Sequence, residues 1–184
     1  CEVLTALDYL DGDTVTERGQ RLMRIYSELD LVAAESLRAG LWDELAPAEL
    51  ASVLSILVYE ARRADDSGAP RVPGGAVRSV IGEMVTRWGQ RDNLESDHRL
   101  DFLREPDLGC AWAAYRWAQG YDLDDVLGDT ELAAGDFVRW MKQLLDLTDQ
   151  VADGAGGTPL RRTAREASDL LRRGVVAYTG LEED

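Results

Sequence analysis

Four polar side chains recur at helical spacing within GDFVRWMKQLLDLTDQ, residues 135–150: Arg139, Lys142, Gln143 and Asp146. Arginine, lysine and glutamine can hydrogen-bond phosphates and base edges, and arginine can also stack on bases. This narrow polar arc is richer in cationic and amide groups than the rest of an acidic chain. Two interpretations stay open for this arc: a solvated face, or a surface that contacts a nucleic-acid strand.

No stretch of the chain carries a motif for catalysis or cofactor binding. It has neither GxxxxGK[ST] nor a GxGxxG after a strand, so those loops are not predicted to bind ATP or NAD here. The single histidine, His98, forms a Glu-x-x-His pair with Glu95, but a di-iron site needs two such pairs. Two aspartate-rich stretches, 8–13 and 122–129, are interpreted as turn and cap charges. We therefore predict no catalytic residue, cofactor or metal in this segment.

The composition is that of an acidic globular chain of 184 residues, 45% hydrophobic and 30% charged, with a formal net charge of −15. That length suits one domain, or one domain with a small appendage. So negative a chain is not expected to bind nucleic acid alone, because binding neutralises phosphates with lysine and arginine. It can still form one wall of a channel whose basic surfaces belong to other domains. The alternative is a stand-alone acidic helical module that binds a basic partner protein.

The sequence favours a cytoplasmic setting. No apolar run approaches the roughly 20 residues that span a bilayer, and no signal-peptide pattern occurs. Two cysteines, Cys1 and Cys110, cannot build a disulfide framework. The first residues already follow a helical pattern, so we expect the chain to be a segment of a longer protein.

Apolar residues at helical spacing predict helices along most of the chain. The predicted helices cover residues 27–40, 46–63, 76–103, 105–120, 123–127, 135–152 and 160–180. Near the start, a turn at Asp11-Gly12 and a short extended stretch predict a tight β element. We therefore expect an all-α helical bundle with a small winged-helix-like β element near its N-terminus. Residues 1–26 are predicted to end a winged-helix-like unit, and residues 27–184 to form the bundle.

The helix from Gly135 is predicted to be a central helix of this bundle. At about 100° per residue, its apolar side chains fall within an arc of roughly 180°, which implies packing against several neighbours. The polar arc of this helix contains Arg139, Lys142, Gln143, Asp146, Asp149 and Gln150. We expect most of the five tryptophans to pack in the core. Trp42 is the one expected to be free for an interdomain contact.

Five motifs follow one another in the chain: LDYLDGDTVTERGQRLMRI at 7–25, the run ending SILVYE at 28–60, YRWAQG at 115–120, GDFVRWMKQLLDLTDQ at 135–150, and LLRRGVVA at 170–177. In this order they resemble the C-terminal helical (DSHCT) domain of superkiller-like DExH-box RNA helicases, especially the actinobacterial HelY-like branch. The resemblance covers nearly the whole chain. One departure is Lys142-Gln143, where the family commonly has two arginines.

The resemblance implies an accessory domain of an ATP-dependent RNA helicase. Such enzymes have two RecA-like domains, a winged helix and this bundle, which closes a ring around a single strand. We expect this strand to be RNA, and DNA remains the alternative. One bundle helix, the ratchet helix, touches the strand. The helix from Gly135 matches it, so Arg139, Lys142, Gln143 and Asp146 are expected to face the strand, with Glu60 near the bases. ATP and magnesium are implied for the RecA-like domains, which this segment lacks.

Overall fold

The computed structural model describes residues 10–11, 14–15, 30–61, 70–97, 106–130 and 132–177. Their helices are α3 (Asp30–Arg38), α4 (Pro47–Val58), α5 (Ala76–Asp97), the 3-10 helix η1 (Leu108–Cys110), α6 (Ala111–Ala118), α7 (Leu123–Gly128), α8 (Ala134–Gly154), α9 (Pro159–Leu171) and α10 (Gly174–Ala177). Two short strands, β1 (Leu10–Asp11) and β2 (Thr14–Val15), pair antiparallel, with Leu10 opposite Val15. Apart from this pair, the secondary structure of the described residues is entirely helical, which confirms the all-α class.

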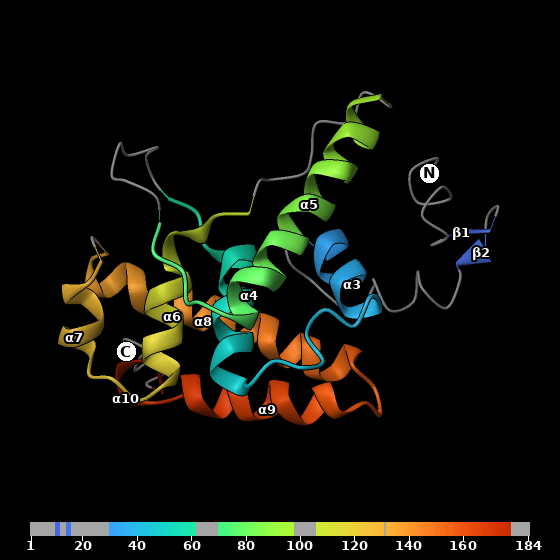
Figure 1. Cartoon of the computed structure of the whole chain (residues 1–184). Helices are drawn as coiled ribbons and strands as arrows, with labels where there is room; N and C mark the ends of the chain where they lie inside the picture. The colour runs from blue at the N-terminus through green and yellow to red at the C-terminus, as the bar shows by residue number, and fades with distance from the viewer. Residues whose placement is uncertain are drawn as a thin grey trace, which may run out of the picture.

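The middle of the bundle belongs to α4. All of its residues from Leu50 to Val58 are buried, and α5, α6, α8 and α9 surround it (Figure 1). Two buried serines lie on this helix. The Ser52 hydroxyl donates to the Ala111 carbonyl at 2.7 Å, and the Ser55 hydroxyl donates to the Ser52 carbonyl at 2.7 Å. These bonds satisfy hydroxyl groups that would otherwise be costly to bury.

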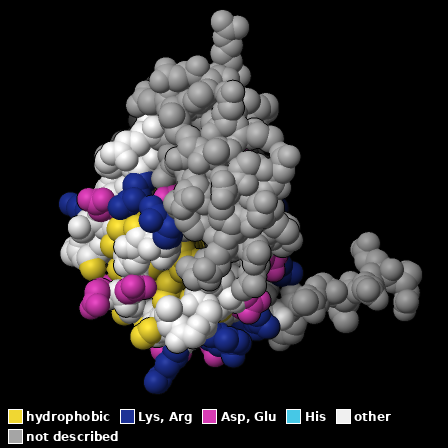
Figure 2. Space-filling view, turned by 90° about the vertical axis from the view of Figure 1, so that its right-hand side faces the viewer, with side chains coloured by type: hydrophobic (Ala, Val, Ile, Leu, Met, Phe, Trp, Pro, Cys, Tyr) yellow, Lys and Arg dark blue, Asp and Glu magenta, His cyan; other side chains and the backbone are white. Residues whose placement is uncertain are grey.

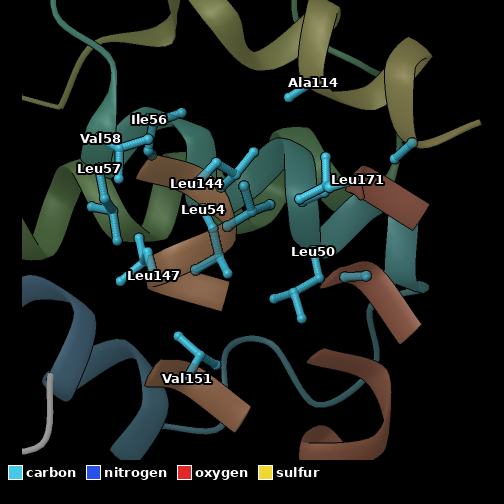
Figure 3. Packing of buried hydrophobic residues seen from close by; sticks show 14 of the residues in the cluster. Leu50, Leu54, Ile56, Leu57, Val58, Ala114, Leu144, Leu147, Val151 and Leu171 are labelled. Carbon is cyan, nitrogen blue, oxygen red and sulfur yellow. The ribbon is translucent and has the colours of Figure 1, made fainter. Parts of the chain in front are cut away.

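The apolar face of α8 packs against α4 and α9. Figure 3 shows Leu144, Leu147 and Val151 of α8 close to side chains of α4. All three are at most 1% exposed, and burying one such side chain contributes about 1.5–3 kcal/mol. The predicted apolar arc is therefore confirmed, and α8 is held along its whole length.

The end of α4 differs from the prediction. The pattern predicts a helix through residue 63, but α4 stops at Val58 and Tyr59 is extended, with φ −74° and ψ 142°. The Ile56 carbonyl, which would accept the next helical bond, instead accepts the backbone N–H of Asp107 at 3.1 Å. A contact distant in sequence therefore ends the helix.

Trp42 is fully buried, so the expectation of an interdomain contact there is wrong. Its exposed fraction is 0%, and its indole N–H donates to the Met84 sulfur at 3.5 Å. Trp42 lies in a turn between two helices, where no periodicity indicates which side is buried. None of the helices in the described residues is long and apolar enough to cross a membrane.

Candidate nucleic-acid interface

The polar arc of α8 lies on the surface of the bundle. Arg139, Gln143 and Asp146 are exposed, and Lys142 is half-buried. The first three follow the spacing i, i+4 and i+7, which places them on one stripe of a helix. The Arg139 side chain keeps 46% of its surface accessible. Because the opposite face of α8 is locked into the core, a rigid element presents this stripe.

An aromatic contact joins the N-terminal half of α8 to the end of α4. The Tyr59 and Trp140 rings meet edge to face, with centroids 5.4 Å apart and planes at 73°. Pairs of this kind add about 0.5–1.5 kcal/mol beyond their burial. Trp140 directly follows Arg139 and Tyr59 directly precedes the exposed Glu60. Two predicted strand-contacting regions, far apart in sequence, therefore lie at the same end of α8.

Asp107 fixes the chain that follows α4. Its carboxylate accepts the backbone N–H groups of Ala61 and Gly109, both at 2.9 Å. Position 109 needs glycine, because a Cβ there would lie 2.6 Å from Cε1 of Tyr59. The loop before α6 thus sets both the position of the Tyr59 ring and the path of the backbone at Glu60.

Carboxylates border both Tyr59 and Arg139. Burial, followed by the charge of Asp107 and a smaller effect of Asp136, raises the pKa of Tyr59 above its usual value of 10.0. The phenol therefore stays protonated at neutral pH and can donate a hydrogen bond. Asp136 also pairs with Arg139 at 3.4 Å, and Cζ of Arg139 lies 4.7 Å from the centroid of the Trp140 ring. A phenol, a guanidinium and an indole are groups that suit phosphates and bases.

The other edge of the polar arc faces α9. Asp149 accepts the Ser168 hydroxyl at 2.7 Å and the Arg172 guanidinium at 3.2 Å. Lys142 lies two helical turns before Asp149 on this edge, so the fold separates it from the stripe of Arg139 and Gln143. Asp149 is engaged with α9, and its charge is compensated there.

The described residues contain neither a metal-binding cluster nor an exposed cysteine thiol. No group of three or more His, Cys, Asp or Glu side chains among them could hold a metal ion. Cys110 is a free, buried thiol. Burial raises its pKa to about 12, so it is not a thiolate at neutral pH. His98 of the Glu-x-x-His pair lies outside the described residues.

Sequence reasoning missed the aromatic and acidic part of this site. Tyr59 is only one letter of the SILVYE motif, Trp140 falls on the apolar side of a helical projection of residues 135–150, and Asp107 follows no periodic pattern. One signal could have marked the site: a tryptophan at the border of an apolar arc, directly beside an exposed arginine. Tryptophans at such borders often keep one edge accessible to partners.

The sequence of this chain matches a known domain family and several larger proteins. The DSHCT (NUC185) domain profile matches residues 12–179. The chain is 43% identical to "Probable helicase HelY" of Mycobacterium tuberculosis over 189 residues, covering 95% of this chain and 21% of that protein. It is 28% identical to Homo sapiens "Superkiller complex protein 2" over 189 residues, covering 98% and 15% respectively. It is 22% identical to Schizosaccharomyces pombe "ATP-dependent RNA helicase mtr4" over 185 residues, covering 97% and 17%.

These similarities are not confined to one motif. The chain spans about a fifth of the length of the HelY protein it matches. The range of 12–179 that matches the domain profile includes two helices of this chain: α4, which forms the core, and α8, which presents the polar arc. The chain therefore belongs to the DSHCT (NUC185) domain family.

Proposed function

We propose that this chain is the C-terminal accessory domain of an ATP-dependent RNA helicase and guides a single strand through the enzyme during unwinding. Membership of the DSHCT family and the similarity to two relatives named as helicases support this parentage. The observation that carries the strand-guiding role is the exposed stripe of Arg139, Gln143 and Asp146, which lies on a helix otherwise locked into the core.

The stripe suits contact without base selection. The Gln143 amide both donates and accepts hydrogen bonds, whereas the Asp146 carboxylate only accepts, for example from base amino groups or a 2′-hydroxyl. Arg139 can donate to a phosphate or stack on a base. A phosphate must compete with Asp136 for that guanidinium, which weakens the contact. Weak, base-tolerant contacts suit a strand that has to move.

The proposal assigns the remaining functions to other parts of the helicase. ATP and magnesium belong to RecA-like domains of the same protein, because this segment contains no phosphate-binding loop. Residues 1–26 are proposed to end a winged-helix unit, and the antiparallel β1–β2 pair supports its wing. The partners are thus these domains and single-stranded RNA, with DNA as the competing substrate, in the cytoplasm.

The test replaces Arg139 and Gln143 by alanine in the full-length helicase and measures unwinding of tailed RNA duplexes at limiting RNA. We expect a roughly tenfold slower rate, since each lost hydrogen bond costs about 0.5–1.5 kcal/mol. The matched control is Gln119→Ala with Arg162→Ala, which removes the same side-chain types from exposed positions outside α8. Arg162, like Arg139, has an ion pair on its own helix, with Glu166 at 2.8 Å. The control should unwind normally.

The outcomes separate the competing interpretations. Normal unwinding by the Arg139/Gln143 variant would show that the arc is only solvated. A full-length protein whose ATPase responds to neither RNA nor DNA, and whose DSHCT segment binds a basic protein in a salt-sensitive way, would favour the acidic interaction module. Repeating the assay with DNA duplexes of the same sequence decides between the two nucleic acids.

A further inference from the structure

Exposed arginines follow one side of α9 as far as its C-cap, and two of them, Arg161 and Arg165, take no part in the contacts described above. Arg161 and Arg165 of α9 and its C-cap residue Arg172 are exposed, and with Ser168 they follow the spacing i, i+4, i+7 and i+11 along one side of the helix. We call the three arginines the α9 arginine stripe. Figure 2 shows Lys and Arg side chains at the lower edge of the molecule, the level at which α9 lies in Figure 1. In a chain of net charge −15, such a row calls for an explanation.

The α9 arginine stripe borders the polar arc of α8. Ser168 and Arg172 both contact Asp149, at 2.7 and 3.2 Å, so this side of α9 faces the seam between the two helices. Arg161 and Arg165 continue the same stripe toward the C-terminal end of α8, because the two helices are antiparallel neighbours joined by a short loop. The stripe therefore extends the surface on which Lys142 and Asp146 lie.

Helix stability does not explain the stripe. The first turn of α9 has no acidic residue and carries Arg161 instead, although the N-terminal end of a helix favours anions over cations by about 0.3–1 kcal/mol. Neutralisation of α8 does not explain it either. Arg172 pairs with Asp149, but no described residue pairs with the side chains of Arg161 or Arg165. Asp153 lies one turn beyond Asp149 on the same edge of α8, and neither of these two arginines pairs with it.

Resting on the function proposed above, we propose that Arg161 and Arg165 bind phosphate groups of the strand that passes over α8, so that its backbone follows the seam between α8 and α9. Guanidinium groups bind phosphate through two parallel hydrogen bonds. Positions i and i+4 place two such groups about 6 Å apart along the helix. Asp146 repels phosphate from the exposed stripe of α8, which favours a backbone position on the α9 side. The Gln143 side chain on α8 is neutral and offers no cationic contact. The arginines of α9 would supply such contacts to the strand instead.

The test measures the salt dependence of oligouridine binding by the full-length helicase carrying Arg161→Ala, Arg165→Ala or both. Each lost phosphate contact should reduce the slope of log K against log salt by about 0.7, and the double variant should lose about twice that. Arg162→Ala is the matched control. It removes the same charge one residue from Arg161, but its side chain is 87% exposed and pairs with Glu166 on the outer edge. Its slope should equal that of the wild type.

Each outcome supports or overturns the proposal. An equal loss of slope in Arg162→Ala would mean that only diffuse charge acts, and an unchanged slope in the Arg161/Arg165 variants would mean that the strand does not reach α9. Loss of a copurifying acidic protein with unchanged oligouridine binding would assign the stripe to a protein partner and reject a strand contact. The proposed α8 function is tested separately. Slow unwinding by the Arg139/Gln143 variant beside a normal Arg161/Arg165 variant would leave it intact while this inference fails.

Discussion

Two groups of arginines in this domain have opposite surroundings. At the α6–α7 end, three guanidinium groups each lie over an aromatic ring: Arg71 over Trp112 at 3.9 Å, Arg116 over Tyr121 at 4.1 Å, and Arg173 over Trp117 at 3.6 Å. On α9, Arg161 and Arg165 have neither a described ring nor a described carboxylate as partner. The residue type is the same, so only the partners distinguish the two groups.

The first group also has fixed acceptors. Asp129 pairs with Arg116 and, at 3.7 Å, with Arg71, and it accepts the Trp112 indole N–H at 3.3 Å. Arg173 donates to the Trp117 carbonyl at 2.7 and 3.0 Å and to the Tyr121 carbonyl. These arginines hold loops and helix ends together. Arg161 and Arg165 of α9 are exposed and have no such acceptor among the described residues.

Arg173→Ala should show the largest effect of this comparison. It leaves two backbone carbonyls without their charged donor and removes the cation above the Trp117 ring. Bonds to charged groups contribute about 1.5–3 kcal/mol, so we expect the free energy of unfolding in urea to fall by about 2 kcal/mol. Arg165→Ala, the matched control from the other group, should stay within about 0.5 kcal/mol of the wild type. Equal losses from both variants would remove the distinction.

Asp129→Asn should show a smaller effect that depends on pH. The Trp112 hydrogen bond, followed by the bond and charge of Arg116, lowers the pKa of Asp129 below 3.8. A lowered pKa stabilises the fold above the unfolded-state value, and the benefit is lost as the pH falls through the folded-state value. The variant should therefore melt slightly below the wild type near pH 7, and the two should begin to converge near pH 4 and meet only below the lowered folded-state pKa of Asp129. A difference that persists in acid would show that the charge of Asp129 is not what matters.

The sequence could predict which side of a helix is buried, but not which residues contact each other across helices. The apolar arc of α8 and the exposure of Arg139 and Gln143 follow from a period of about 3.6 residues, which any single helix reveals. Thr158 and Pro159 mark the start of α9 in the same local way, and the structure has them there. The partners of Arg71 and Arg173 lie on helices distant in sequence, so no local pattern separates these arginines from those of α9.

The candidate site shows the same limit. Its polar stripe could be predicted, whereas the Tyr59–Trp140 contact could not, because it depends on α4 ending at Val58. That end is set by Asp107, which reaches the Ile56 carbonyl from beyond α5. Helical periodicity instead predicts that α4 continues, which would have carried Tyr59 and Glu60 onto helical positions. Tertiary hydrogen bonds of Asp107 therefore decide where Tyr59 and Glu60 lie.

Arg161→Glu should show the smallest effect on stability, and with the opposite sign. The substitution puts an anion in the first turn of α9 in place of a cation, so the helix dipole should raise the free energy of unfolding by about 0.3–1 kcal/mol. Arg165→Glu lies one turn further on, where the dipole is weak, and should gain nothing. Urea denaturation of both variants measures the difference. A loss of stability in Arg161→Glu would place Arg161 with the structural arginines around α6. A gain would mean that the domain keeps a destabilising cation at this position, as expected of a residue retained for binding rather than for folding.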